Sequence, residues 1–238
     1  MEQIISEGLA AMGLTGQVPE SSPALLARYG SMMLEKNQVM NLTAIRESDQ
    51  AARLHMLDSA ALLRCADLQG GKTLIDVGTG AGLPGMALKI LIPDLSVTLL
   101  DSLQKRLDWL DEVASTLDLS GVTTLHARAE EQGLLPGFRD SFDFAAARAV
   151  ADLRLLWELC LPFVKVGGKF LAMKSVDCDE ELSAAASGIS FLGGKVVSLY
   201  DYPVPGTDVT HRVVVIEKVS PTPKGYPRRW AKMQKQPL

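Results

Sequence analysis

The residues best suited to binding a small molecule form a glycine-rich loop, DVGTGAGLPG, at positions 76–85. The loop follows an apolar run and leads into a helical pattern, and this strand–loop–helix context gives a glycine motif its meaning. Glycines at 78, 80 and 82 let the backbone turn tightly and approach a ligand without interference from a Cβ atom. The sequence therefore predicts a ligand-binding loop at the end of a strand.

Two aspartates at strand ends bear on which cofactor this loop binds. Residues 80–85 also fit GxGxxG, so a dinucleotide-binding enzyme is the natural alternative. Asp76 ends the strand before the glycines, and its carboxylate would repel a pyrophosphate but suit S-adenosylmethionine, which carries an ammonium and a sulfonium. Asp101 ends the next strand and can accept hydrogen bonds from both ribose hydroxyls, as either cofactor class requires. Together they favour an S-adenosylmethionine-dependent methyltransferase, with simple turn capping as the alternative role.

Polar residues at three later strand ends extend the predicted site. A backbone amide near Ala129-Glu130, after the third strand, can meet an adenine edge. Arg148, after the fourth, can hold the cofactor or present its guanidinium to a base or a phosphate. Its alternative role is a salt bridge to Asp143 or Asp152. Lys174 has a similar position after the fifth strand, with an exposed lysine as the alternative.

The elements that must position these residues form an alternating pattern from residue 71 onward. The predicted strands are Thr73–Val77, Ser96–Leu100, Val122–His126, Phe142–Ala147, Lys169–Met173, Lys195–Leu199 and Arg212–Glu217. The predicted helices between them are Pro84–Ile92, Gln104–Leu117 and Leu153–Val164. Strands separated by helices imply a parallel, doubly wound sheet. Only a turn-rich segment separates the last two strands, which are expected to pair antiparallel at one edge. The predicted fold is α/β and Rossmann-like, with a mostly parallel seven-stranded sheet.

Residues 1–70 have a different, helical texture. Leu26, Tyr29 and Met33 lie on one predicted helix face, and a second helix is expected to begin near Ser48. The chain is therefore divided into an N-terminal helical extension (1–70), an S-adenosylmethionine-binding methyltransferase domain (71–219) and a basic C-terminal tail (220–238).

Composition and cysteine usage point to a cytoplasmic enzyme without a metal. Apolar residues make up 47% and charged residues 22%, as is ordinary for a globular protein. The first residues lack a basic, apolar leader, and the longest apolar stretch is too short to cross a bilayer. The three cysteines are widely spaced without a CxxC pair, which argues against disulfides and structural zinc.

The net charge of −4 conceals a basic C-terminal tail that carries +5 on a body of −9. Such an arm can bind a phosphate backbone, and aromatic residues between the basic ones can stack on bases. The RNA contacts predicted here are Lys224, Arg228, Arg229, Trp230 and Lys232. Truncation after Val219 is expected to weaken RNA binding and leave cofactor affinity intact. The alternative is a solvated terminus.

The histidines, and the tryptophans outside the tail, are expected to have mostly structural roles. His55 and Asp58 share a helix face and either lie near the cofactor pocket or close the helical extension over the sheet. His126 and His211 lack acidic or cysteine neighbours at ligand spacing and are predicted to be structural. Trp109 and Trp157 lie within predicted helices and are expected in the core.

Two motifs that are absent from the sequence limit the possible classes of methyl acceptor. Exocyclic-amine methyltransferases carry an Asn/Asp-Pro-Pro-aromatic segment after the fourth strand, where this chain has AAARAV at 145–150. Cytosine-C5 enzymes need a cysteine nucleophile, typically after proline, and no cysteine here follows a proline. An acceptor that is already nucleophilic remains, either a ring nitrogen or a small molecule.

Several short segments occur in the order typical of one family. They are NLTAIR (41–46), HMLDS (55–59), the glycine loop, LLDS (99–102) with Lys105-Arg106, Ala129-Glu130 and Arg148-Ala149. From about residue 25 to 218 the chain resembles the RsmG (GidB) family of bacterial 16S ribosomal RNA guanine-N7 methyltransferases, and YPRR at 226–229 resembles a common ending of its members. One departure is Lys174-Ser175, where many members have Lys-Gly.

The resemblance implies a class I methyltransferase fold and transfer of a methyl group from S-adenosylmethionine to nitrogen-7 of a guanine. Its partner would be 16S ribosomal RNA or the small ribosomal subunit, with no membrane and no metal involved. The implied cofactor residues are Gly78, Leu83, Ala129, Glu130 and Arg148, with Asp101 as the ribose acid, beside Asp76, Gly80 and Gly82 from the loop. Arg148 and Lys174 are expected to position the reaction. Two alternatives remain: a methyltransferase for a small molecule or protein, and a non-catalytic S-adenosylmethionine-binding module.

Overall fold

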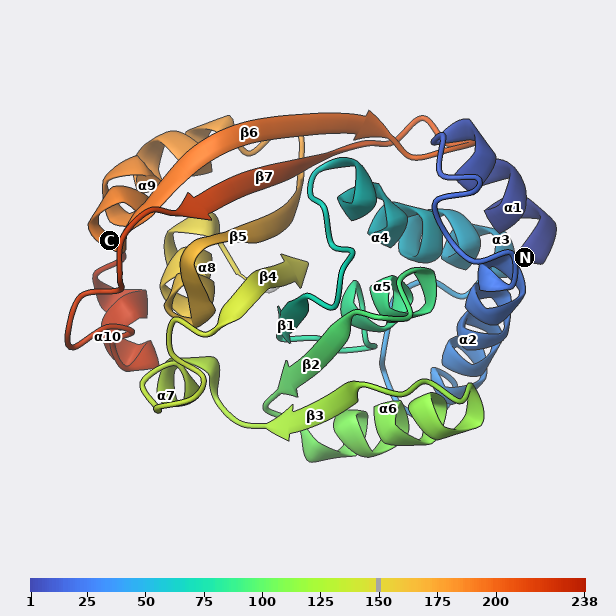
Figure 1. Cartoon of the computed structure of the whole chain (residues 1–238), viewed down its shortest axis with the longest axis horizontal. Coiled ribbons are helices and arrows are strands. Elements are labelled where there is room, and N and C mark those ends of the chain that lie inside the picture. Colours follow the sequence, from blue (N-terminus) through green and yellow to red (C-terminus); the bar gives the residue numbers. More distant parts are fainter. Residues whose placement is uncertain (149–150) are drawn as a thin grey trace.

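A seven-stranded sheet forms the centre of the protein in the computed structural model, which describes residues 1–148 and 151–238 (Figure 1). The strands are β1 (Thr73–Val77), β2 (Ser96–Asp101), β3 (Val122–His126), β4 (Phe142–Arg148), β5 (Val164–Ser175), β6 (Gly194–Pro203) and β7 (Thr210–Lys218). Their spatial order is β3-β2-β1-β4-β5-β7-β6. The first five strands pair in parallel, and β7 lies antiparallel between β5 and β6. The predicted Rossmann-like, mostly parallel sheet with an antiparallel end is confirmed.

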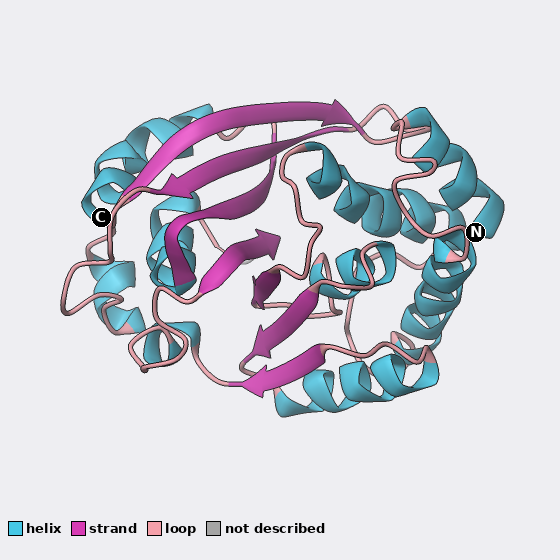
Figure 2. Ribbon diagram, viewed as in Figure 1, coloured by secondary structure: helices cyan, strands magenta, loops and turns pink. Residues whose placement is uncertain are grey.

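Helices cover both faces of the sheet (Figure 2). One face carries α5 (Gly85–Leu91), α6 (Gln104–Thr116) and the N-terminal helices, and the other carries α7 (Ala129–Gln132), α8 (Leu153–Cys160), α9 (Asp179–Phe191) and α10 (Trp230–Lys235). Side chains alternate accordingly, since Leu74 belongs to the first core cluster and Ile75 to the second. Trp109 and Trp157 are buried in the two cores, as expected.

The helix predicted over Leu153–Val164 is longer than the helix in the structure. The α-helix ends at Cys160, and a 3-10 turn at Leu161–Phe163 leads into β5. Pro162 explains the difference, because it has no amide hydrogen for a helical hydrogen bond and its ring clashes with the preceding turn. β5 therefore begins earlier than the predicted Lys169.

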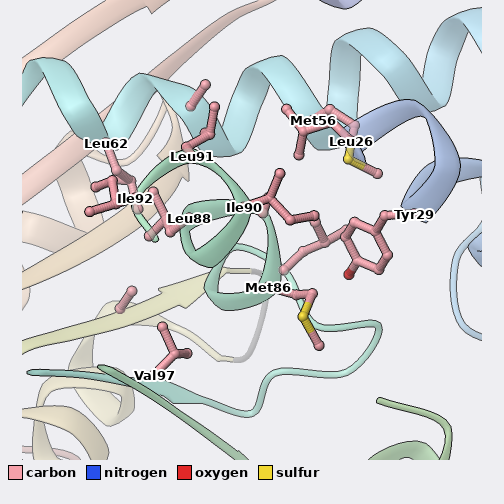
Figure 3. Close-up of a cluster of buried hydrophobic side chains, with 14 of the residues drawn as sticks. Leu26, Tyr29, Met56, Leu62, Met86, Leu88, Ile90, Leu91, Ile92 and Val97 are labelled. Atoms are coloured by element: carbon pink, nitrogen blue, oxygen red, sulfur yellow. The ribbon is translucent and has the colours of Figure 1, made fainter. Parts of the chain in front are cut away.

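The N-terminal segment shares its core with the sheet. It contains α1 (Glu2–Ala11), α2 (Ser22–Lys36), α3 (Ser48–Ala51), the π-helical turn η1 (Ala52–Leu57), α4 (Asp58–Ala60) and the 3-10 turn η2 (Ala61–Arg64). The predicted stripe on α2 is fully buried. In Figure 3, Leu26, Tyr29 and Met56 lie beside Met86 and Ile90 of α5. The extension is thus packed directly on the helix that follows the glycine loop.

The C-terminal tail lies against the opposite side of the molecule, near α7 and α8 (Figure 1). Arg228 forms a salt bridge of 2.6 Å with Glu158 of α8, whose side chain is fully buried. Met233 of α10 is fully buried in the second core cluster. Among the helices that the structure describes, none has the length and apolar character needed to cross a membrane.

Candidate functional site

Two adjoining cavities lie at the carboxyl ends of the parallel strands, where the chain order reverses between β1 and β4. This is the usual ligand position in open α/β sheets. The larger cavity has a volume of about 520 Å³ and the smaller about 300 Å³, and Gly78 and Arg106 line both. The larger cavity is lined by Leu42, Thr43, Leu54, His55, Asp58, Gly78, Thr79, Gly80, Ala81, Leu83, Arg106, Arg148, Met173, Lys174, Ser175 and His211. The smaller is lined by Val77, Gly78, Leu100, Asp101, Ser102, Arg106, Ala127, Arg128, Ala129, Glu130, Leu159 and Trp230.

The glycines of the loop have different surroundings: some border open space, and one is closely packed. Gly78, Gly80 and Gly82 have φ angles of +71°, +57° and +85°, in the left-handed region that favours glycine. A Cβ atom on Gly80 would meet nothing closer than a backbone oxygen at 3.9 Å, so this residue borders open space. A Cβ atom on Gly82 would lie 2.6 Å from Leu110 and 2.7 Å from the Tyr29 hydroxyl. Gly82 therefore allows the loop to pack against α2 and α6, whereas Gly78 and Gly80 line the cavity.

Asp76 supports the glycine loop from within. Its Oδ2 accepts hydrogen bonds from the Thr79 hydroxyl at 2.7 Å and from the Gly85 amide at 2.8 Å. The side chain is fully buried, and its Oδ1 has no hydrogen-bond partner among the described residues. Burial raises the pKa of this carboxyl to about 6, although the two donors partly oppose that rise. Asp76 does not line either cavity, and its hydrogen bonds are to the glycine loop itself.

Asp101 borders the smaller cavity and joins β2 to the loop. Its Oδ2 accepts a hydrogen bond of 2.9 Å from the Gly80 amide, and its Oδ1 accepts one of 2.9 Å from the Leu103 amide. Arg106 lies 3.3 Å from Oδ2. A carboxylate can accept about four hydrogen bonds, so Asp101 retains acceptor capacity toward the cavity.

The far wall of the smaller cavity comes from three separate parts of the chain. Ala129 and Glu130 begin α7, Leu159 comes from α8, and Trp230 begins α10. The structure thus brings Ala129 and Glu130 together with Asp101, as the sequence analysis predicted for a nucleoside site. It places Trp230, predicted to contact RNA, in the wall of the same cavity.

Arg148 is held by the N-terminal extension. Its guanidinium lies 3.1 Å from Asp58 Oδ2 and 3.1 Å from the Leu54 carbonyl oxygen. The alternative partners Asp143 and Asp152 are wrong, because they form salt bridges with Lys165 and Arg154 instead. Its partner Asp58 lies 90 residues away along the chain, so no local sequence pattern predicts the pair. Ala149, the second residue of the Arg148-Ala149 motif, lies outside the described residues.

Asp58 connects three chain regions in the larger cavity. Its Oδ1 accepts hydrogen bonds of 2.7 Å from the Tyr202 hydroxyl and from His211 Nδ1, while Oδ2 faces Arg148. Burial alone raises the pKa of Asp58, but these three neighbours together hold it below its ordinary value. The hydrogen bond to Asp58 in turn raises the pKa of His211. His211, for which the sequence offers no acidic residue at ligand spacing, therefore has an acidic partner in the folded protein that lies 153 residues away along the chain.

His55 joins the loop before α3 to the Arg148 network. Its Nε2 lies 2.7 Å from the Thr43 hydroxyl, and its Nδ1 lies 3.3 Å from Arg148 Nη2. Asn37, which ends the α2 stripe, accepts hydrogen bonds from the Leu42 and Thr43 amides and so fixes this loop. Burial and the nearby charge of Arg148 lower the pKa of His55 to about 4, so the imidazole is neutral at pH 7.

The remaining predicted residues divide between the cavity and the surface. Lys174 lines the larger cavity and forms a salt bridge of 2.8 Å with Glu181. Ser175 also lines the cavity and pairs in register with His211. Lys224, Arg229 and Lys232 are exposed. Arg228 is committed to the buried Glu158, which argues against a phosphate contact by that side chain.

The two cavities together suit an elongated ligand with a polar sugar and a cationic end. The smaller offers a carboxylate and backbone groups, and the larger offers the turn of the glycine loop beside a charged network. No group of three or more histidine, cysteine or acidic side chains suited to a metal ion occurs within residues 1–148 and 151–238.

Comparison with known proteins finds matches over nearly the whole chain. A family model described as rRNA small subunit methyltransferase G matches residues 23–203. Ribosomal RNA small subunit methyltransferase G of Alkaliphilus oremlandii is 43% identical over 238 residues, covering 100% of this chain and 99% of the relative. The protein of the same name from Lachnoclostridium phytofermentans is 45% identical over 210 residues, covering 88% of this chain and 87% of that protein.

Solved structures show the same fold. TrmN from Thermus thermophilus is 26% identical with a TM-score of 0.53, covering 68% of this chain and 48% of that one. A SAM-dependent O-methyltransferase from Thermotoga maritima is 17% identical with a TM-score of 0.54, covering 81% of this chain and 73% of that one. At such low identity the second likeness concerns the fold alone.

Proposed function

Because the chain belongs to the rRNA small subunit methyltransferase G family, we propose that it methylates nitrogen-7 of a guanine in small-subunit (16S) ribosomal RNA. The methyl donor in this proposal is S-adenosylmethionine. The observation that carries it is the double cavity at the β1/β4 switch point, with Asp101 in one part and Arg148 in the other.

The residues present fit this cofactor. In the smaller cavity, Asp101 would accept hydrogen bonds from the ribose hydroxyls, and the backbone at Ala129 and Glu130 would meet the adenine edge. The glycine loop would hold the methionine part, since Gly80 leaves open space where a side chain would intrude. Asp76 places a buried carboxylate with one unpartnered oxygen beneath that loop, which suits a cationic ligand better than a pyrophosphate.

The larger cavity would hold the base that accepts the methyl group. S-adenosylmethionine supplies an electrophilic methyl group, and guanine nitrogen-7 has an in-plane lone pair with no proton to lose. A general base is therefore unnecessary, and the protein's contribution is to position the two reactants. Asp58 and the Leu54 carbonyl fix the guanidinium of Arg148, so this side chain is oriented before the base enters.

The charge balance of the larger cavity also suits this reaction. Methyl transfer moves positive charge from the sulfur to the base, so an unbalanced cationic cavity would oppose it. The Asp58 carboxylate offsets the charge of Arg148, and Glu181 offsets that of Lys174. His55 is neutral because its pKa is lowered to about 4.

The RNA contacts are proposed for exposed basic residues of the tail. Lys224, Arg229 and Lys232 face solvent. A target base must be unpaired or flipped out of its stack to enter the larger cavity. Arg228 is not included, since Glu158 already neutralises it.

The direct test incubates the protein with labelled S-adenosylmethionine and small ribosomal subunits that lack this modification, with large subunits as the control. The expected result is label only in small-subunit RNA, recovered as 7-methylguanosine after digestion. Label in another nucleoside would contradict the nitrogen-7 assignment. Label in a protein or small molecule, with none in RNA, would favour the alternative acceptor class.

A further inference from the structure

Trp230 is the one tail residue that lines either described cavity. Trp230 borders the smaller cavity together with Ala129, Glu130 and Leu159, and it packs against the second core cluster. This residue is partly exposed, whereas Trp109 and Trp157 are buried in the cores. It is therefore the tryptophan that a ligand in this cavity can reach.

A buried ion pair fixes the backbone immediately before Trp230. Glu158 Oε1 accepts hydrogen bonds from the Arg228 amide at 2.7 Å and Nε at 2.8 Å, and Oε2 accepts one from Nη2 at 2.6 Å. Glu158 is fully buried and precedes Leu159, which lines the same cavity. Removing either partner would leave the other charge buried and uncompensated, so the two residues hold the tail to α8.

Further contacts fix the chain on both sides of this anchor. Arg139 donates hydrogen bonds to the carbonyl oxygens of Tyr226 at 2.5 Å and Thr222 at 2.8 Å. Tyr226 packs edge-on against Phe191, and Met233 is fully buried beyond Trp230. The tail segment around Trp230 is thus part of the folded body.

We propose that Trp230 is a cofactor-contact residue that forms an aromatic wall of the adenine site. The inference rests on the proposed function, because it takes the smaller cavity to be the place of the adenosine part of S-adenosylmethionine. Purine rings stack favourably on tryptophan, because both present a flat π-face. The tail then supports cofactor binding, contrary to the expectation that truncation after Val219 leaves cofactor affinity intact.

The test measures the dissociation constant of S-adenosylhomocysteine for the full-length protein by isothermal titration calorimetry. Trp230→Ala should raise this constant about 10-fold, and Trp230→Phe, which keeps an aromatic ring, less than about 3-fold. Gln234→Ala is the matched control, since Gln234 is exposed on the same helix, and it should leave the constant unchanged. 5′-Methylthioadenosine should lose the same factor with Trp230→Ala, because it retains the adenine and lacks the amino acid.

A second measurement uses the fluorescence of the indole itself. Binding of S-adenosylhomocysteine should change the emission of the wild-type protein, and Trp230→Phe should remove most of that change. This variant keeps an aromatic ring at the position, so the measurement remains decisive if Trp230→Ala does not fold.

The outcomes separate this inference from the proposed function. Wild-type protein that fails to bind S-adenosylhomocysteine would overturn both. Tight binding by wild type with equal affinity in Trp230→Ala, or an emission change that persists in Trp230→Phe, would overturn the role of Trp230 alone.

Discussion

Asp76 and Asp101 flank the same loop but act on different sides of it. The Asp76 carboxylate bonds to Thr79 and Gly85 inside the protein, and Asp101 bonds to Gly80 while bordering the smaller cavity. Strand ends and glycine spacing are sufficient to predict that both aspartates lie at the ligand-binding loop. They do not reveal which carboxylate faces the ligand, because that depends on the path of the loop between them.

The role of Asp101 can be tested with a small change. Asp101→Asn keeps an acceptor for the Gly80 amide but removes the charge available to ribose hydroxyls. We expect the dissociation constant of S-adenosylhomocysteine to rise about 10-fold, because hydrogen bonds to charged groups contribute about 1.5–3 kcal/mol. RNA affinity should not change. Asp108→Asn, at an exposed position of α6, is the control. An equal loss of cofactor and RNA binding would show that Asp101 is structural.

The raised pKa of Asp76, about 6 against an ordinary 3.8, predicts a pH-dependent stability. A folded protein that binds this proton more tightly than the unfolded chain gains stability from it at low pH and loses that gain as pH rises. Without cofactor, the free energy of unfolding of wild type relative to Asp76→Asn should fall by about 2 kcal/mol between about pH 4 and pH 7. Urea unfolding at several pH values measures this difference, and a constant difference would refute the raised pKa.

At the scale of elements, α2 contributes to the ligand site although it lies outside the sheet. The Tyr29 hydroxyl donates a hydrogen bond to the Ala81 carbonyl oxygen of the glycine loop, and Tyr29 is fully buried. The helical stripe in the sequence correctly predicted that Leu26, Tyr29 and Met33 share a buried face. Periodicity could not predict that the far end of one of these side chains reaches the loop.

Removing this hydroxyl should loosen the loop. Tyr29→Phe leaves the Ala81 carbonyl without its buried donor, which costs about 1–3 kcal/mol in the free energy of unfolding. We also expect a several-fold weaker affinity for S-adenosylhomocysteine. Chemical denaturation and calorimetry measure the two effects, with Ser31→Ala at an exposed position of α2 as the control. Unchanged stability and affinity would mean that the hydrogen bond does not support the loop.

At the scale of the whole molecule, the larger cavity is assembled by the order of the strands. β7 inserts between β5 and β6, and its register places His211 opposite Ser175, next to Lys174. Asp58 of the N-terminal extension then bonds to His211 and Arg148. The sequence predicted an antiparallel pair at this edge, but the register and the long-range ion pairs depend on the complete fold and leave no local signal.

This long-range network predicts a shift in a histidine titration. The hydrogen bond to Asp58 raises the pKa of His211 in the folded protein, so Asp58→Asn should lower it toward or below its ordinary value. Tyr202→Phe removes a different hydrogen bond to Asp58 and should leave the His211 pKa raised. Nuclear magnetic resonance titration of the ring protons measures both, and a His211 pKa that is unaffected by Asp58→Asn would contradict the network.

In the proposed function, one cofactor molecule lies across both cavities. Hydrogen–deuterium exchange with and without saturating S-adenosylhomocysteine tests this placement directly. The expected result is slower exchange in three separate segments at once, residues 78–83, 101–106 and 127–130, with β6 unchanged. Tight binding with protection confined to another part of the molecule, or to only one of the two cavities, would contradict it.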